Sequence, residues 1–259
     1  MIDKLILISC GLVAIGVGGL GYEYSQGRSL SDLTNQAAVS ETKSVNMSNV
    51  QNLSFDMSVG DLHITPSNGN QLVVSAHGEM SKQLLEKMKL TVVKKGNSVS
   101  VSFQRHARFG IGLFLPSITS VDVDVEMPAK NYQSIAVDAG TADVSLGRTH
   151  ATSTTIHDGT GDVHLSDVHS DLSVSTGTGD ITMQASQLGQ HTNLKAGTGD
   201  IEVTLQQVPK NVHYALQSGT GSIRWLGQRM NSKTNAIIGK GTNTFQATTG
   251  TGDITVQQG

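Results

Sequence analysis

The chain has 259 residues and a formal net charge of −3, with 29 glycines, one cysteine, 15% charged residues and 4% aromatic residues. This charge argues against a nucleic-acid-binding protein, because such proteins need a basic surface to neutralise phosphates. A single cysteine excludes a disulfide-rich scaffold and a metal centre built from several thiolates. Few charges and many Gly, Ser and Thr residues favour an all-β chain with many tight turns.

An uncharged segment, residues 5–22, lies near the N-terminus. As a helix it would be about 27 Å long, enough to cross the core of a bilayer. Three interpretations of residues 1–22 stay open: an uncleaved membrane anchor, a cleaved signal peptide, or a lipoprotein signal lipidated at Cys10. All three export the rest of the chain, with the N-terminus cytoplasmic next to Lys4. Residues 23–44 are polar and are predicted to form a stalk.

The front half of the folded part, residues 45–130, is predicted to be mostly β structure. Alternating apolar residues predict strands at 45–55, 72–76, 90–93, 99–103 and 121–127. One short helix is expected over residues 81–89, because Leu84, Leu85 and Met88 would share one face.

A loop at residues 105–117 combines cations with aromatic residues, namely Arg105, Arg108, Phe109 and Phe114. Such a loop can pack over an open end of the core as a cap, which is the more common arrangement. It can also enter a membrane interface or bind a partner. Both interpretations stay open from the sequence.

Residues 131–259 repeat the phrase Gly-Thr-Gly-Asp followed by a β-branched residue. The first glycines of the six copies are Gly140, Gly159, Gly177, Gly197, Gly219 and Gly250, and the fourth positions are Asp143, Asp162, Asp180, Asp200, Ser222 and Asp253. Their spacings of 19, 18, 20, 22 and 31 residues are typical of a solenoid. Apolar residues alternate with polar ones on both sides of each turn. The sequence therefore predicts an all-β fold, a β-solenoid of stacked strand repeats with about 20 residues per coil.

The repeated turn is predicted to be structural. Its glycines would supply positive φ angles, and its Asp would accept from backbone N–H groups in an Asx-type turn. Calcium bound by Asp162, Asp180, Asp200 and Asp253 is the alternative, although calcium β-rolls repeat their motif about twice as often. A phosphate cradle is excluded because each turn leads into a strand rather than a helix. Asp158 replaces the small residue before the glycine and is predicted to distort its corner.

Stacking in sequence order predicts which residues become neighbours. Glu202 and Arg224 occupy the same outward position of consecutive repeats, so we expect a pair between them. Ile254–Val256 would be the terminal edge strand and could pair with a second copy of the chain.

Nothing in the sequence indicates catalysis. The nine histidines form no metal-ligand pattern such as His-Glu-x-x-His, and there is no Gly-x-Ser-x-Gly motif. We expect no enzymatic activity, and no cofactor is predicted.

The Gly-Thr-Gly-Asp-Ile/Val copies, together with Gly239-Lys-Gly-Thr-Asn-Thr-Phe245, resemble the bacterial putative-adhesin family of β-strand-repeat envelope proteins, a domain of unknown function. The resemblance covers roughly residues 47–256. It implies a solenoid displayed outside the bacterial cell membrane, or secreted if the N-terminal segment is cleaved. Two functions follow: an adhesin or interaction scaffold that binds an unknown protein or a cell-wall or matrix ligand, or an envelope-stress sensor that binds membrane, cell-wall polymer or a signalling partner.

Overall fold

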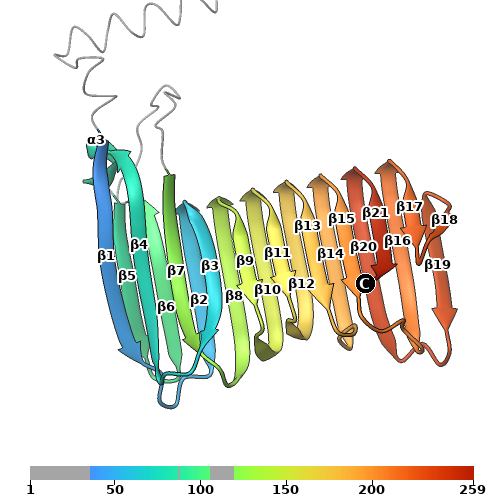
Figure 1. Cartoon of the computed structure of the whole chain (residues 1–259), viewed down its shortest axis with the longest axis horizontal. Coiled ribbons are helices and arrows are strands. Elements are labelled where there is room, and N and C mark those ends of the chain that lie inside the picture. Colours follow the sequence, from blue (N-terminus) through green and yellow to red (C-terminus); the bar gives the residue numbers. More distant parts are fainter. Residues whose placement is uncertain (1–35, 87, 106–119) are drawn as a thin grey trace, which may run out of the picture.

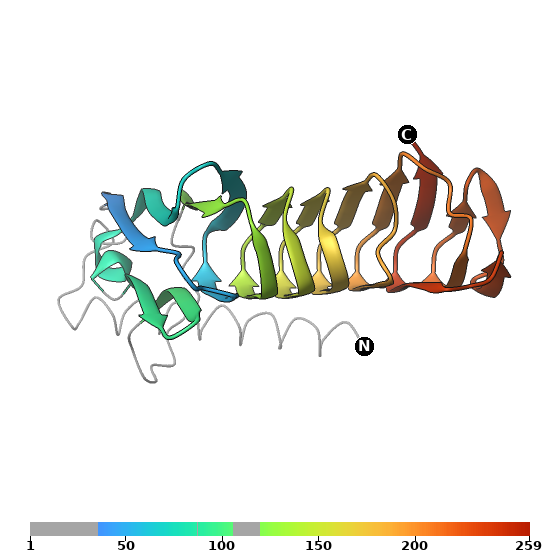
Figure 2. The same cartoon turned by 90° about the horizontal axis from the view of Figure 1, so that it is seen from below.

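The computed structural model describes residues 36–86, 88–105 and 120–259. Within these residues, 21 strands form two sheets that face each other along an elongated rod (Figure 1, Figure 2). The eleven-stranded sheet contains, in spatial order, β1 (Gln36–Asn46), β4 (Gln71–Ser81), β7 (Ser120–Pro128), β3 (Asp61–Ser67), β9 (Val144–Gly147), β11 (Val163–Ser166), β13 (Ile181–Ala185), β15 (Ile201–Leu205), β21 (Ile254–Gln258), β17 (Ile223–Trp225) and β18 (Gln228–Met230). The ten-stranded sheet contains β19 (Lys233–Ile238), β16 (Val212–Thr220), β20 (Asn243–Thr251), β14 (His191–Thr198), β12 (His169–Thr178), β10 (His150–Thr160), β8 (Asn131–Thr141), β2 (Asn52–Val59), β6 (Ser98–Arg105) and β5 (Met88–Lys95).

Each repeat forms one coil of the rod. Its first strand belongs to the ten-stranded sheet, the Gly-Thr-Gly segment turns the corner, and its second strand belongs to the eleven-stranded sheet. Successive coils pair in parallel without a shift at the corner, so that Thr141, Thr160, Thr178 and Thr198 are direct neighbours. The predicted β-solenoid is therefore confirmed. An earlier coil, β2 followed by β3, stacks on β8 and β9.

The last repeat does not occupy the end of the rod. Strands β20 and β21 lie between β14–β15 and β16–β17, so the final coil separates the fourth repeat from the fifth (Figure 1). The predicted Glu202–Arg224 pair is wrong for this reason, because Thr255 stands between the two residues. The predicted edge at Ile254–Val256 is also wrong, since β21 has a partner on each side. The edge strands at this end are β18 and β19, because residues 228–238 turn back and pair antiparallel with β17 and β16 instead of adding a further coil.

The front half differs from its prediction in three places. Residues 36–46 form β1, which pairs antiparallel with β4, so the end of the predicted stalk belongs to the sheet. As an edge strand, β1 fully buries only Val39 and thus lacks the apolar alternation that marks a half-buried strand. Residues 47–51 interrupt the predicted strand 45–55. The predicted helix exists as α3 (Lys82–Leu85), and Met88 already belongs to β5.

The core is one continuous layer between the two sheets. It consists of the inward-facing apolar side chains of every coil, and full burial of each Val, Leu or Ile contributes roughly 1.5–3 kcal/mol. Near the C-terminal end the Tyr214 and Trp225 rings stack with centroids 4.2 Å apart, and Phe245 lies against Trp225. These aromatic rings fill the core where the inserted coil meets the fifth repeat.

Several predicted features lie outside the described residues. They are the membrane segment at residues 1–22, the stalk up to residue 35, and Arg108, Phe109 and Phe114 of the predicted loop. Arg105 is the last residue of β6. Among the described residues, no helix has the length and apolar character that a membrane crossing requires.

Candidate functional site

The carboxylates of the Gly-Thr-Gly-Asp corners form a ladder of hydrogen bonds along the rod. Each Oδ1 accepts from the backbone N–H at the same position of the next coil, over 2.7 to 3.0 Å. The ladder runs in the spatial order Asp61, Asp143, Asp162, Asp180, Asp200, Asp253 and Ser222. The sequence predicts that each Asp accepts from N–H groups within its own turn. In the structure it accepts from the next coil instead, and this bond ties each coil to its neighbour.

Ser222 ends this ladder and changes the electrostatics of its last carboxylate. The backbone N–H of Ser222 donates to Oδ1 of Asp253 over 2.7 Å. Donation from the backbone and side chain of Ser222, with the nearby positive charge of Arg224 and Arg229, lowers the pKa of Asp253. In the rest of the row each carboxylate likewise accepts from a backbone N–H of the adjacent coil, which offsets its negative charge.

The glycines of the corner are required by close approach of the coils. The second glycine of the motif has a positive φ between 142° and 154° at Gly161, Gly179, Gly199, Gly221 and Gly252. A Cβ atom on Gly179 would lie 1.9 Å from the carbonyl oxygen of Gly161 in the preceding coil. At the first copy this position is Ala142, which does not have a positive φ. The corner is therefore a backbone contact with no room for side chains.

The ladder does not assemble a metal centre. Within the described part of the chain, no group of three or more His, Cys, Asp or Glu side chains is placed to hold a metal ion. Calcium binding at Asp162, Asp180, Asp200 and Asp253 stays a prediction of the sequence.

Asp158 is a buried acid at the inward position of its corner. It is 7% exposed, pairs in register with Ala139 and Thr176, and leaves the corner regular, so the predicted distortion is wrong. Its Oδ2 accepts from the Thr176 hydroxyl over 3.2 Å, while Oδ1 has no hydrogen-bond partner among the described residues. Burial raises the pKa of Asp158 to about 6.

The opposite corner of each coil is made of loops, and it is irregular. The first two loops contain two residues each, and Arg148 and Asp167 turn the chain there with positive φ angles of 38° and 48°. The next two loops, residues 186–190 and 206–211, contain five and six residues. The loop corner therefore widens toward the C-terminal end.

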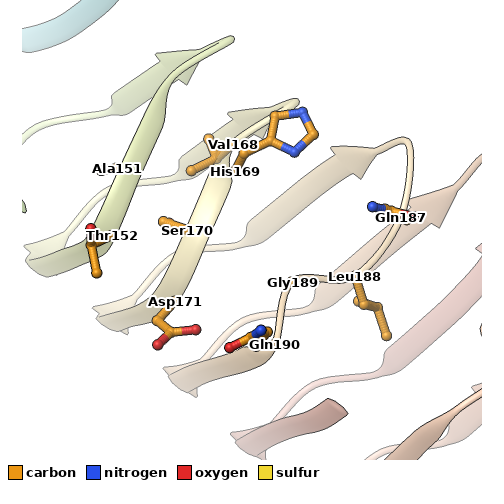
Figure 3. A pocket seen from close by; sticks show the side chains of 10 residues that line it. All are labelled: Ala151, Thr152, Val168, His169, Ser170, Asp171, Gln187, Leu188, Gly189 and Gln190. Atoms are coloured by element: carbon orange, nitrogen blue, oxygen red, sulfur yellow. The ribbon is translucent and has the colours of Figure 1, made fainter. Parts of the chain in front are cut away.

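A shallow groove lies along these longer loops. One depression of about 290 Å³ lies between β10, β12 and the loop 186–190, and a second of about 600 Å³ continues along the loop 206–211. Gln187 and Leu188 line both (Figure 3). Figure 3 shows residues 187–190 running beside the strand that carries His169, Ser170 and Asp171.

The lining of the groove is polar and mostly uncharged. Amide side chains predominate, namely Gln187, Gln190, Gln206, Gln207, Asn211, Asn243 and Gln258. Asp171 and Lys210 are the charged residues of the lining. The His169 ring stacks on that of His150 with centroids 4.7 Å apart, and the Ser170 hydroxyl is buried without a partner among the described residues. Amides both donate and accept, so this surface suits a ligand rich in hydroxyl groups.

The longer loops are held by contacts to the preceding coil. Oδ1 of Asp167 accepts from both the backbone N–H and the hydroxyl of Ser186, over 3.1 and 2.9 Å. Leu188 is 7% exposed and anchors the loop in the core. The backbone N–H of Gln207 donates to the Ser186 carbonyl over 3.1 Å. The groove is therefore preformed, which limits the entropy lost when a ligand binds.

A second polar cluster lies on the outer face of the eleven-stranded sheet. The His77 ring nitrogens lie 3.6 Å from Asp122 and 3.5 Å from Asp124, and His63 lies 3.9 Å from Asp122. All four side chains are about half exposed, so these contacts contribute little to stability. Sequence reasoning missed this cluster because β3, β4 and β7 become neighbours only through the sheet order.

Two facing sheets, glycine corners and stacked coils define a two-sheet β-solenoid. The chain belongs to the Toastrack DUF4097 family, whose model matches residues 50–169 and 132–257. No curated protein matches the sequence. Among solved structures, a putative cell adhesion protein from Clostridium sporogenes is similar over 86% of this chain and 100% of its own, with 15% identity and a TM-score of 0.52.

Two further similar structures are putative adhesins from Bacteroides fragilis and Parabacteroides distasonis. Their identities are 11% and 12%, and they cover 84% and 83% of this chain and 97% and 96% of their own. Their TM-scores are 0.35 and 0.34. The match to the family model confirms the β-strand-repeat family that the repeats indicate.

Proposed function

We propose that this protein is a non-enzymatic surface protein of the bacterial cell envelope, acting as an adhesin or an interaction scaffold. Its folded part is then extracytoplasmic and held at the membrane by residues 1–22, or secreted if that segment is cleaved. The name of the similar Clostridium protein supports adhesion. The observation that carries the proposal is the preformed groove along the loops 186–190 and 206–211.

The ligand that this groove suits best is a neutral glycan. Each Gln or Asn side chain offers two donors and one acceptor, which match the hydroxyl groups of sugars. A groove lined by amides avoids the desolvation of buried charges, and bridging waters can complete its hydrogen bonds. Gln187 is central because it lines both depressions and is exposed.

Binding of the full-length chain to immobilised neutral glycans, peptidoglycan and matrix proteins tests the proposal. We expect glycan binding that Gln187→Ala with Gln207→Ala weakens by roughly tenfold, since each lost hydrogen bond contributes about 0.5–1.5 kcal/mol. Gln246→Ala is the matched control, because Gln246 is exposed on the outer face of the ten-stranded sheet and away from the groove. If the double variant and the Gln246→Ala control bind glycans equally well, the groove is not the binding site. Binding to membrane or a signalling partner alone would favour an envelope-stress sensor instead.

A further inference from the structure

Charge is distributed unevenly along the rod. Residues 146–205 contain seven Asp and Glu residues and two Lys and Arg residues. Residues 206–259 contain one acid, Asp253, and five cations: Lys210, Arg224, Arg229, Lys233 and Lys240. The C-terminal end is therefore locally basic in a chain whose formal net charge is −3.

Three of these cations belong to the terminal strands of the two sheets. Arg224 and Arg229 are in direct register in the antiparallel pair β17–β18, and both are exposed. Lys233 begins β19, the edge strand of the other sheet, three residues after the end of β18, and it pairs with the exposed Gln217 on the outer face of that sheet. This end of the rod lies opposite the end formed by β1 and β5 (Figure 1, Figure 2).

The arginine pair keeps a net positive charge, because Asp253 is close enough to interact with both arginines but supplies one negative charge against two positive ones. Like charges directly opposite each other in an antiparallel pair are unfavourable, with their Cα atoms about 4.5–5.5 Å apart. None of the ion pairs among the described residues involves Arg224 or Arg229. Glu202 is separated from Arg224 by Thr255, and its carboxylate accepts from Gln257 over 2.8 Å. Two guanidinium groups therefore face solvent side by side.

We propose that Arg224 and Arg229 form a docking surface for an anionic polysaccharide that carries sulfate or carboxylate groups. Guanidinium groups bind such oxyanions through paired N–H donors, and two adjacent arginines can hold consecutive charged groups of one polymer. This surface is separate from the groove, and it names a second ligand class for the rod.

A polymer fits this surface better than a membrane or a folded protein. Val208 and Ile237 are the large apolar side chains that residues 206–259 expose, and neither is aromatic, whereas membrane-interface binding relies on several apolar and aromatic side chains. Trp225 and Tyr214 are buried. A stable protein interface buries about 800 Å² on each partner around an apolar, aromatic-rich centre, which these charged side chains do not supply.

Binding of the full-length chain to dextran sulfate and to uncharged dextran tests this inference. We expect binding to dextran sulfate at low ionic strength, its loss toward ~0.5 M salt, and none to dextran. Arg224→Gln with Arg229→Gln should weaken binding roughly tenfold. The matched control, Lys89→Gln with Lys95→Gln, removes the same charge from exposed positions of β5 at the opposite end and should leave binding unchanged. Arg224→Lys with Arg229→Lys should retain part of the affinity, because lysine keeps the positive charge but lacks the paired N–H donors of the guanidinium group.

Three results would overturn the inference: equal weakening by both Gln variants, equal binding of dextran, or binding only to equimolar vesicles of phosphatidylglycerol and phosphatidylcholine. Thermal melting of each variant separates lost binding from lost folding. The groove is tested by a different variant and by neutral glycans, so either proposal can fail without the other.

Discussion

The two corners of each coil differ in how closely their structure repeats from one coil to the next. At the Gly-Thr-Gly-Asp corner the backbones of adjacent coils touch, and each carboxylate bonds to the next coil. At the loop corner the connection grows from two residues to six, and a groove opens where the loops lengthen. The tight corner thus fixes the stacking of the coils. The loop corner is free to vary and to carry recognition, as loops on rigid scaffolds commonly do.

Adding one methyl group at the tight corner should have the largest effect, and a glycine in an open turn elsewhere serves as its control. Gly179→Ala places a Cβ atom 1.9 Å from a backbone oxygen at a φ of 142°, so we expect a loss of at least ~3 kcal/mol in unfolding free energy. Gly69→Ala, in the turn between β3 and β4, has nothing nearer than 3.9 Å and should change stability by less than ~0.5 kcal/mol. Urea unfolding measures both. Similar midpoints would contradict the view that the tight corner excludes side chains.

The repeated corner is also the part of the fold that the sequence predicts best. A solenoid gives the same signal in each coil, so the glycine spacing and the alternation reinforce one another over residues 131–259. The position of the last coil could not be predicted. Strands β15, β17 and β21 share the same alternation of apolar and polar residues. The local sequence therefore does not determine whether β15 pairs with β17 or with β21.

The candidate site could not be predicted, because its residues share no motif. Gln187 and Gln207 lie in two separate loops and Asn243 begins β20, and only the stacking of coils brings them to one groove. Amides in loops are common and carry no spacing signal. The loop lengths are visible in the repeat spacing, which rises from 18 to 20 and 22 residues, and this is the signal that could have located the groove.

Replacing Asp158 tests whether the tight corner is more stable with an uncharged side chain at this inward position. Its pKa is raised to about 6, so the folded state holds the proton more tightly than the unfolded state does. Its contribution to stability is present at low pH and is lost as the pH rises from about 4 to about 6. Asp158→Thr should therefore raise the unfolding free energy by about 2 kcal/mol near pH 7.5, and by much less near pH 4.

A threonine also suits this position chemically. At the equivalent place the Thr249 hydroxyl donates to the Gly199 carbonyl of the neighbouring coil over 2.8 Å. The control is Gln246→Thr at an exposed strand position whose register partners, Asn193 and Ala215, are uncharged, and it should have a small effect that does not change between the two pH values. An equal gain for Asp158→Thr at both pH values would assign the effect to strand propensity rather than to the buried charge. Melting curves at each pH measure the difference.

The smallest expected effect concerns the ladder of carboxylates. Asp180→Ala removes the acceptor of the Asp200 N–H, a contact of 2.7 Å, and should cost about 1 kcal/mol, because water can partly replace an exposed acceptor. Asp180→Asn keeps an oxygen at that place and removes one of several like charges, so we expect a change below ~0.5 kcal/mol. Asp138→Ala serves as the control for removing a carboxylate without a ladder bond. If Asp180→Ala and Asp138→Ala lose equal stability, then backbone contacts between glycines alone hold the tight corner, and the repeated Asp must be explained by something other than the stacking of coils.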